Sequence, residues 1–142
     1  MPLSAQLYDQ NSQPLDIQLI GVIDLLLRDG KGNLVVVDHK TSKLAKSQSA
    51  VDSDLQTTAY SYLLAANRFV FPLAEVQARF DVLRKLKTPK FEQYYTRRGP
   101  DSRKRFAHLT ATVLSGIENR VFLPCKGWLC ADCEYGEACQ NW

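Results

Sequence analysis

The chain has 142 residues, 45% of them hydrophobic, and a formal net charge of +3 at pH 7. A chain of this length buries one hydrophobic core and little more, so we expect a single domain of residues 1–142. No apolar stretch approaches the ~18 residues of a membrane-spanning helix and no signal segment opens the chain, which excludes a membrane partner and predicts a cytoplasmic protein.

Two strands joined by a hairpin are expected early in the chain. Residues 17–27 and 34–40 are apolar runs typical of strands, and the second is β-branched at three successive positions. Residues 28–33, between them, contain the Asp-Gly and Gly-Asn pairs of a hairpin loop. Asp24 and Asp38 lie on either side of this loop, so the hairpin is expected to bring their carboxylates close together.

The second strand ends in an acid, a spacer and a lysine. Because side chains alternate between the two faces of a strand, Asp38 and Lys40 share a face and His39 points the other way. Two carboxylates in proximity repel unless a cation neutralises them, and oxygen ligands suit Mg²⁺ or Mn²⁺. We therefore predict a divalent-metal site at Asp24 and Asp38. The alternative is an exposed cross-strand ion pair without chemistry.

An amphipathic helix is expected over residues 55–66, preceded by an N-cap and negative charge at residues 52–54. Gln56 and Tyr60 are four residues apart and so lie on one face of this helix. The alternative is that Gln56 is merely solvated and that Tyr60 lies at the rim of the core.

Taken together, residues 21–24, residues 34–41, Gln56 and Tyr60 resemble the PD-(D/E)XK nuclease superfamily, specifically its RecB-like exonuclease branch. The resemblance implies a restriction-endonuclease-like nuclease core and DNA as the partner. It also implies hydrolysis of phosphodiester bonds that depends on Mg²⁺ or Mn²⁺, in DNA repair, recombination or phage DNA processing.

The resemblance further implies a role for each matching residue. Asp24 and Asp38 would hold the metal, together with the main-chain carbonyl of His39. Lys40 would position or help deprotonate the attacking water and stabilise charge on the phosphoryl oxygens. The Gln–Tyr pair would line the site or the DNA groove beside it. The catalytic residues would then be Asp24, Asp38, Lys40, Gln56 and Tyr60.

Two more strands, over residues 76–84 and 91–96, and a second helix, over residues 103–118, are expected in the rest of the chain. This order of elements predicts an α/β fold of the α+β kind, with a mixed central β-sheet flanked by helices.

Basic residues crowd the stretch that follows the first helix. A basic face beside an acidic metal site is what a phosphodiester substrate requires, although a charge run is also typical of a solvated face. The residues are Arg84, Lys85, Lys87, Lys90, Arg97, Arg98, Arg103, Lys104 and Arg105.

All four cysteines lie near the C-terminus, at positions 125, 130, 133 and 139. In a cytoplasmic chain this density favours a metal over disulfides. Some RecB-like nucleases join a C-x2-C-x5-C run and one upstream cysteine to a [4Fe–4S] cluster, and Cys130, Cys133 and Cys139 match that run. Either Cys125 is the fourth ligand of an iron–sulfur or zinc site, or the fourth ligand lies outside this chain. Free thiols are the remaining alternative.

The family places a helix with a Glu before the first catalytic strand, whereas the first Glu here is Glu75. We therefore expect an N-terminally truncated nuclease domain with a Cys-rich segment at residues 122–142, belonging to a larger helicase–nuclease or recombination complex. Two alternatives stay open. One is a non-catalytic nucleic-acid-binding module, and the other is a cysteine–metal interaction domain.

Overall fold

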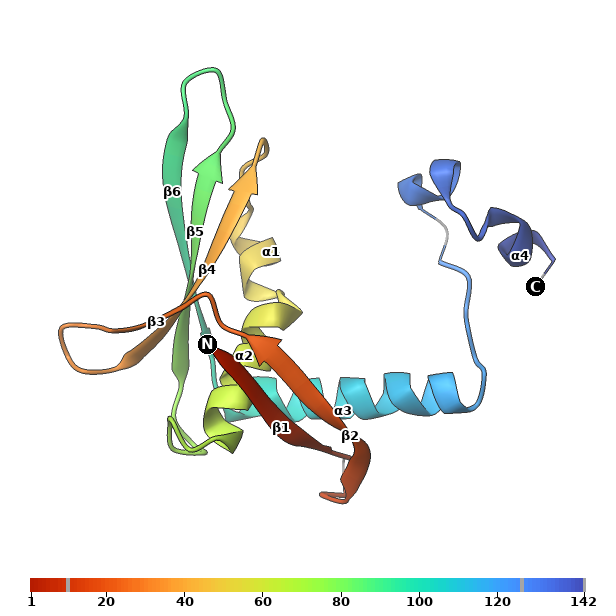
Figure 1. Ribbon diagram of the computed structural model, residues 1–142, viewed down its shortest axis with the longest axis horizontal. Coiled ribbons are helices and arrows are strands. Elements are labelled where there is room, and N and C mark those ends of the chain that lie inside the picture. Colours follow the sequence, from red (N-terminus) through yellow and green to blue (C-terminus); the bar gives the residue numbers. More distant parts are fainter. Residues whose placement is uncertain (10, 126, 142) are drawn as a thin grey trace. The chain divides into compact units, whose positions relative to one another are not determined.

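The computed structural model describes residues 1–9, 11–125 and 127–141 (Figure 1). The chain divides into two compact units, Met1–Ala111 and Thr112–Trp142, and each is described by itself. The Cys-rich segment expected at residues 122–142 lies in the second unit. That residues 1–142 form one domain stays a prediction.

A four-stranded sheet forms the centre of the first unit. Its order is β3-β4-β5-β6; β4 and β5 are parallel, and the two outer pairs are antiparallel. The prediction of a mixed central sheet in an α+β fold is therefore confirmed. A separate antiparallel pair, β1-β2, precedes it. The strands are β1 (Pro2–Tyr8), β2 (Pro14–Val22), β3 (Leu25–Arg28), β4 (Leu34–Ser42), β5 (Val76–Arg84) and β6 (Lys90–Arg98).

Helices connect the parallel strands, as a parallel pair requires. The short helix α1 (Gln48–Asp52) and the longer α2 (Leu55–Ala66) lie between β4 and β5 in the chain and against one face of the sheet (Figure 1). The N-terminus of α2 is fixed by the Asp54 side chain, which accepts a hydrogen bond from the Thr57 amide. A third helix, α3 (Pro100–Glu118), follows β6.

The core lies between α2 and the sheets. Tyr60, Leu63 and Leu64 of α2 pack with Val36 of β4 and with neighbouring strand residues in one cluster of buried side chains. Val36 of β4 and Val76 and Ala78 of β5 thus form the apolar face that α2 covers. This packing fixes the position of α2 relative to β4, and with it the positions of the residues discussed below.

One expected element is wrong. The apolar run at residues 17–27 is two strands in two sheets, because the chain changes partner at Ile23 and Asp24. The Ile23 amide donates to the Met1 carbonyl at 2.9 Å, and the Met1 ammonium donates to the Ile23 carbonyl at 2.6 Å. The strand therefore leaves the β1-β2 pair and re-pairs, as β3, with β4.

The second unit contains the end of α3, a 3₁₀ helix at Trp128–Asp132 and helix α4 (Gly136–Gln140). None of its residues for which burial is described, which leaves out residues 126, 128, 129 and 142, is buried. Among the described residues of the whole chain, no helix is long and apolar enough to cross a bilayer.

Candidate functional site

The acid and the lysine of β4 form an ion pair at its C-terminal half. Asp38 is 2% exposed, and its Oδ2 lies 2.9 Å from Nζ of Lys40. The two side chains share a face of β4, as the sequence predicts, because one residue separates them on an extended strand. The His39 side chain between them is exposed.

Asp24 lies next to this pair on the neighbouring strand. Leu25 pairs with Val37 in the β3-β4 register, so Asp24, one residue before β3, is opposite Asp38. Its Oδ2 accepts a hydrogen bond of 2.9 Å from the His39 amide. The main chain of β4 thus fixes the Asp24 carboxylate beside the buried acid. Sequence reasoning missed this anchor, because a main-chain donor leaves no mark on the sequence.

Helix α2 supplies the other side of the site through a chain of hydrogen bonds. Nζ of Lys40 donates to Oε1 of Gln56 at 2.9 Å, and Nε2 of Gln56 donates to the Tyr60 hydroxyl at 2.8 Å. The Tyr60 hydroxyl donates to the Val22 carbonyl at 3.1 Å. The two residues expected to share a helix face therefore do so, and they connect β4 to the end of β2. The carbonyl of Val22 is a second anchor that the sequence does not reveal.

The charges at the site oppose one another. Burial raises the pKa of Asp38, because a carboxylate is poorly solvated there; the ion pair with Lys40 opposes this effect only in part. Burial lowers the pKa of Lys40, but the close contact of Nζ with Asp38 and the negative charge of Asp38 outweigh burial, so the pKa is raised overall. Burial, followed by the charge of Asp38, raises the pKa of Tyr60. Lys40 is therefore cationic and Tyr60 neutral at pH 7.

The donor set fits a hard divalent cation. Oδ2 of Asp38 is buried and has no hydrogen-bond partner among the described residues, its contact with Lys40 being an ion pair without hydrogen-bond geometry. In the described part of the chain, no group of three or more His, Cys, Asp or Glu side chains is arranged to hold a metal ion. Mg²⁺ is commonly held by only one or two carboxylates plus water and substrate phosphate, so two acids and a main-chain carbonyl suit it.

Two residues of the basic stretch do not belong to a substrate-binding face. Arg98 is 4% exposed and donates to the Thr58 hydroxyl and to the Val51 carbonyl, which is at the end of α1. Arg103 is 6% exposed and donates to Ser61 and to the Ala74 carbonyl. These arginines join helices and loops to the sheet inside the first unit, and the interpretation of them as phosphate ligands is wrong.

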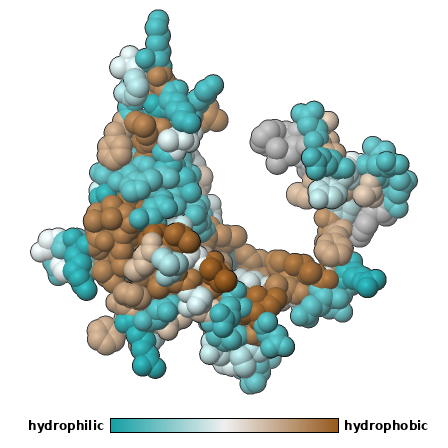
Figure 2. Space-filling model, viewed as in Figure 1, coloured by the Kyte–Doolittle hydropathy of each residue, from teal (hydrophilic) through white to brown (hydrophobic). Residues whose placement is uncertain are grey.

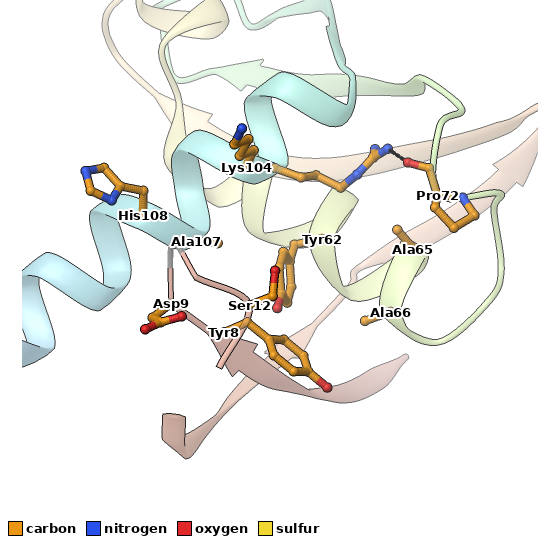
Figure 3. A pocket seen from close by; sticks show the side chains of 11 residues that line it. Tyr8, Asp9, Ser12, Tyr62, Ala65, Ala66, Pro72, Lys104, Ala107 and His108 are labelled. Carbon is orange, nitrogen blue, oxygen red and sulfur yellow. Dashed lines mark hydrogen bonds between the residues drawn. The ribbon is translucent and has the colours of Figure 1, made fainter. Parts of the chain in front are cut away.

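A cavity of about 700 Å³ in the first unit lies between β1, α2 and the start of α3 (Figure 3). Tyr8, Tyr62 and His108 are among the residues that line it. Neither Asp24 nor Asp38 lines this cavity, so it is separate from the acidic site.

The four cysteines lie around one cavity in the second unit, lined also by Gly127 and Gly136. All four are free thiols. The Gly127 amide donates to Sγ of Cys130 at 3.3 Å, and Sγ of Cys130 donates to the Cys125 carbonyl at 3.7 Å. Within the described residues, these thiols are not arranged as a group that could hold a metal ion.

The sequence was compared with known proteins. The family model described as "PD-(D/E)XK nuclease superfamily" matches residues 2–140. Among solved structures, "Crystal structure of SSO0001" matches with 13% sequence identity and a TM-score of 0.43; the alignment covers 99% of this chain and 59% of that one. The chain thus spans less than two thirds of that protein. No curated protein matches. The mixed α+β architecture is consistent with a restriction-endonuclease-like fold, and the family match over nearly the whole length shows that the chain belongs to the PD-(D/E)XK nuclease superfamily.

Proposed function

We propose that this protein is a Mg²⁺- or Mn²⁺-dependent deoxyribonuclease of the RecB-like exonuclease branch, acting in the cytoplasm on DNA in repair, recombination or phage DNA processing. The observation that carries the proposal is the buried Asp38 carboxylate, held 2.9 Å from Lys40 and opposite Asp24. A buried acid with a carboxylate oxygen that accepts no hydrogen bond from the described residues is stabilised by a cation, and a bound divalent cation promotes the hydrolysis of a phosphodiester.

Each site residue then has a distinct task. Asp24 and Asp38, with the main-chain carbonyl of His39, would hold a divalent ion that polarises the scissile phosphate and lowers the pKa of the attacking water. The His39 amide orients Asp24 through its hydrogen bond to Oδ2.

Lys40 is positioned by two partners, since Nζ contacts both Asp38 and Gln56 at 2.9 Å. A cation held there can orient the attacking water and stabilise negative charge as it develops on the phosphoryl oxygens. Tyr60 acts through Gln56, whose amide it orients by accepting a hydrogen bond. Gln56 and Tyr60 are thus positioning residues for the lysine.

The test is cleavage of end-labelled single- and double-stranded DNA by the full chain with Mg²⁺ or Mn²⁺. We expect cleavage that EDTA stops, and we expect Asp24→Asn or Asp38→Asn to abolish it, because each removes a charged ligand and little volume. Asp16→Asn is the matched control, as Asp16 is an exposed acid on β2. Products from 5′- and 3′-labelled strands give the polarity of an exonuclease.

If both Asp24→Asn and Asp38→Asn retain cleavage, the assignment of these two acids as metal ligands is wrong. DNA binding that needs no metal, with no turnover by the unmodified chain, would favour the non-catalytic nucleic-acid-binding module. A chain that neither binds nor cuts DNA would favour a cysteine–metal interaction domain.

We also propose that the C-terminal cysteines hold a [4Fe–4S] cluster or zinc. Their shared cavity supports this, and the presence of Cys125 beside the three others favours Cys125 as the fourth ligand. The hydrogen bond from the Gly127 amide to Sγ of Cys130 also supports this, because ligands of a metal ion usually accept or donate a further hydrogen bond that orients them. In this proposal the protein works within a larger helicase–nuclease or recombination complex.

A further inference from the structure

Two neighbouring segments beyond the acidic site carry unpaired lysines. One comprises the turn between β5 and β6 together with Lys90, the first residue of β6, and the other connects β4 to α1. Within the described residues, none of these lysines forms an ion pair, and all are exposed. Lys46 also lies in the segment between β4 and α1, but it is only partly exposed, and its Nζ lies 4.8 Å from the centre of the Phe80 ring, so it is not counted with them. We name the exposed set the lysine lobe: Lys43, Lys85, Lys87 and Lys90.

Arg84 ties the two segments into one surface. Its Nη1 donates to both carboxylate oxygens of Glu92 at 2.9 Å, and its Nη2 donates to the Lys43 carbonyl at 3.0 Å. The Lys85 amide donates to the Ser42 carbonyl at 2.8 Å. Glu92, an acid of the same hairpin, is therefore already neutralised by an arginine, so the positive charge of the lysine lobe is not cancelled from within.

The lysine lobe lies at the same end of β4 as the acidic site. Lys40 is level with Val82 in the parallel β4-β5 register, so Lys85 and Lys87 follow three and five residues further along the hairpin. β5 ends at Arg84, so at ~3.3 Å per strand residue the turn that carries Lys85 and Lys87 begins roughly 7 Å beyond Lys40. Figure 1 shows the β5-β6 turn extending past the end of the sheet, and Figure 2 shows hydrophilic residues there.

The opposite end of β4 differs. The β3-β4 turn carries a single lysine, Lys31, and its acid, Asp29, is two residues away and binds the turn's own amides. The positive charge is thus concentrated on the side of the sheet end that a substrate at Asp38 and Lys40 would pass. The contrast also supplies a matched control.

We propose that the lysine lobe binds the sugar–phosphate backbone of the DNA about two or more nucleotides from the scissile phosphate, at ~3.4 Å per nucleotide along a duplex strand. The inference rests on the proposed function, because the acidic site defines where the scissile phosphate lies. Such contacts add affinity without sequence preference, and each one releases a counterion from the DNA.

The test compares two double variants in a metal-free buffer with EDTA, by the fluorescence anisotropy of a labelled 20-base-pair DNA. Lys85→Ser/Lys87→Ser should weaken binding roughly tenfold or more at ~0.1 M salt and reduce the slope of log affinity against log salt by about 2, equally for unrelated sequences. Arg28→Ser/Lys31→Ser removes the same charge from exposed residues at the opposite end of β4 and should change neither. Lys85→Arg/Lys87→Arg keeps the charge, so this variant should have the DNA affinity and the salt slope of the unmodified chain.

Cleavage assays separate this inference from the proposed function. The lobe variant should raise KM and leave kcat unchanged, as expected when binding is lost equally from substrate and transition state. An unchanged salt slope in a chain that cuts DNA overturns the lysine lobe and leaves the nuclease assignment intact. A reduced slope in a chain that never cuts supports the lobe and overturns the nuclease. Unchanged DNA affinity with lost binding to phosphatidylserine vesicles assigns the lobe to a membrane surface and overturns the inference.

Discussion

Asp38 lies at a position that opposes folding while it favours a bound cation. Burial raises its pKa, and a carboxyl group whose pKa is higher in the folded than in the unfolded state favours folding only while it is protonated. That contribution is complete below the usual carboxyl pKa of about 4 and is lost as the pH rises through the raised value. At pH 7 the charge of Asp38 therefore reduces stability in the absence of metal.

It follows that Asp38→Asn should raise the melting temperature at pH 7 in EDTA, because the neutral amide mimics the protonated acid. The gain over the unmodified chain should disappear as the pH falls below ~4. Thermal unfolding followed by circular dichroism at several pH values measures this. Asp16→Asn, at an exposed acid, should show no such gain. A lower melting temperature of Asp38→Asn at pH 7 would show that the ion pair with Lys40 outweighs burial.

Lys40 is tested by turnover. Lys40→Ala should reduce kcat by ~100-fold or more, because a fixed cation beside the phosphate is lost, while Mn²⁺ still binds to the two acids. Steady-state cleavage together with isothermal titration of Mn²⁺ separates the two effects. If metal affinity falls with activity, Lys40 supports the carboxylates and does not act on the phosphate.

At the scale of elements, the contact between β2 and α2 positions Tyr60 and Gln56. Gly21 lies so close to α2 that an added Cβ would be 2.6 Å from Cδ1 of Leu63, a side chain buried completely in the core. Gly21→Ala should therefore lower the free energy of unfolding by about 1–3 kcal/mol. Gly30→Ala is the control, since nothing lies within 4 Å of a Cβ there, and it should change stability by less than ~0.5 kcal/mol. Urea unfolding of both variants measures the two free energies of unfolding. Equal values for Gly21→Ala and Gly30→Ala would mean that the core around Leu63 repacks to accept the added methyl group.

Local signals account for the elements that the sequence predicts well. The strand at residues 34–40, the hairpin before it and the helix at 55–66 follow from periodicity, turn residues and the Asp54 cap, which are all readable from neighbouring residues. These local signals also predict the part of the site formed by Asp38 and Lys40 on β4 and by Gln56 and Tyr60 on α2. The divided strand at residues 17–27 could not be predicted, because the partner of Ile23 is Met1, 22 residues away.

Two further features depend on tertiary contacts alone. Strand β1 and helix α1 were not expected: α1 has five residues and a single buried side chain, Val51, so it carries almost no amphipathic pattern. Arg98 and Arg103 look like phosphate ligands in the sequence, yet they satisfy buried carbonyls. Charge counts along the chain therefore overestimate the substrate-binding surface, and burial is what separates the lysines of the lobe from these arginines.

At the scale of the whole molecule, the two units are stabilised differently. The two clusters of buried apolar side chains among the described residues consist of residues from Met1–Ala111. In Thr112–Trp142, no residue whose burial is described is buried. A segment without a core needs another source of stability, such as a bound metal. The sequence predicts the cysteine cluster because its spacing is local, but it leaves the fourth ligand open, since that depends on where Cys125 lies.

The fourth ligand is tested on the full chain prepared without oxygen. If Cys125 completes the site, native mass spectrometry and absorbance should find about one zinc or one iron–sulfur cluster per chain, with thiols protected from alkylation. Cys125→Ser should then lose the metal and leave three reactive thiols, while Ser115→Ala, outside the cavity, should retain it. Metal retained in Cys125→Ser would exclude Cys125 as a ligand. A metal-free tail with four reactive thiols in this chain would point to a fourth ligand elsewhere, which a longer chain carrying that ligand would confirm by regaining the cluster.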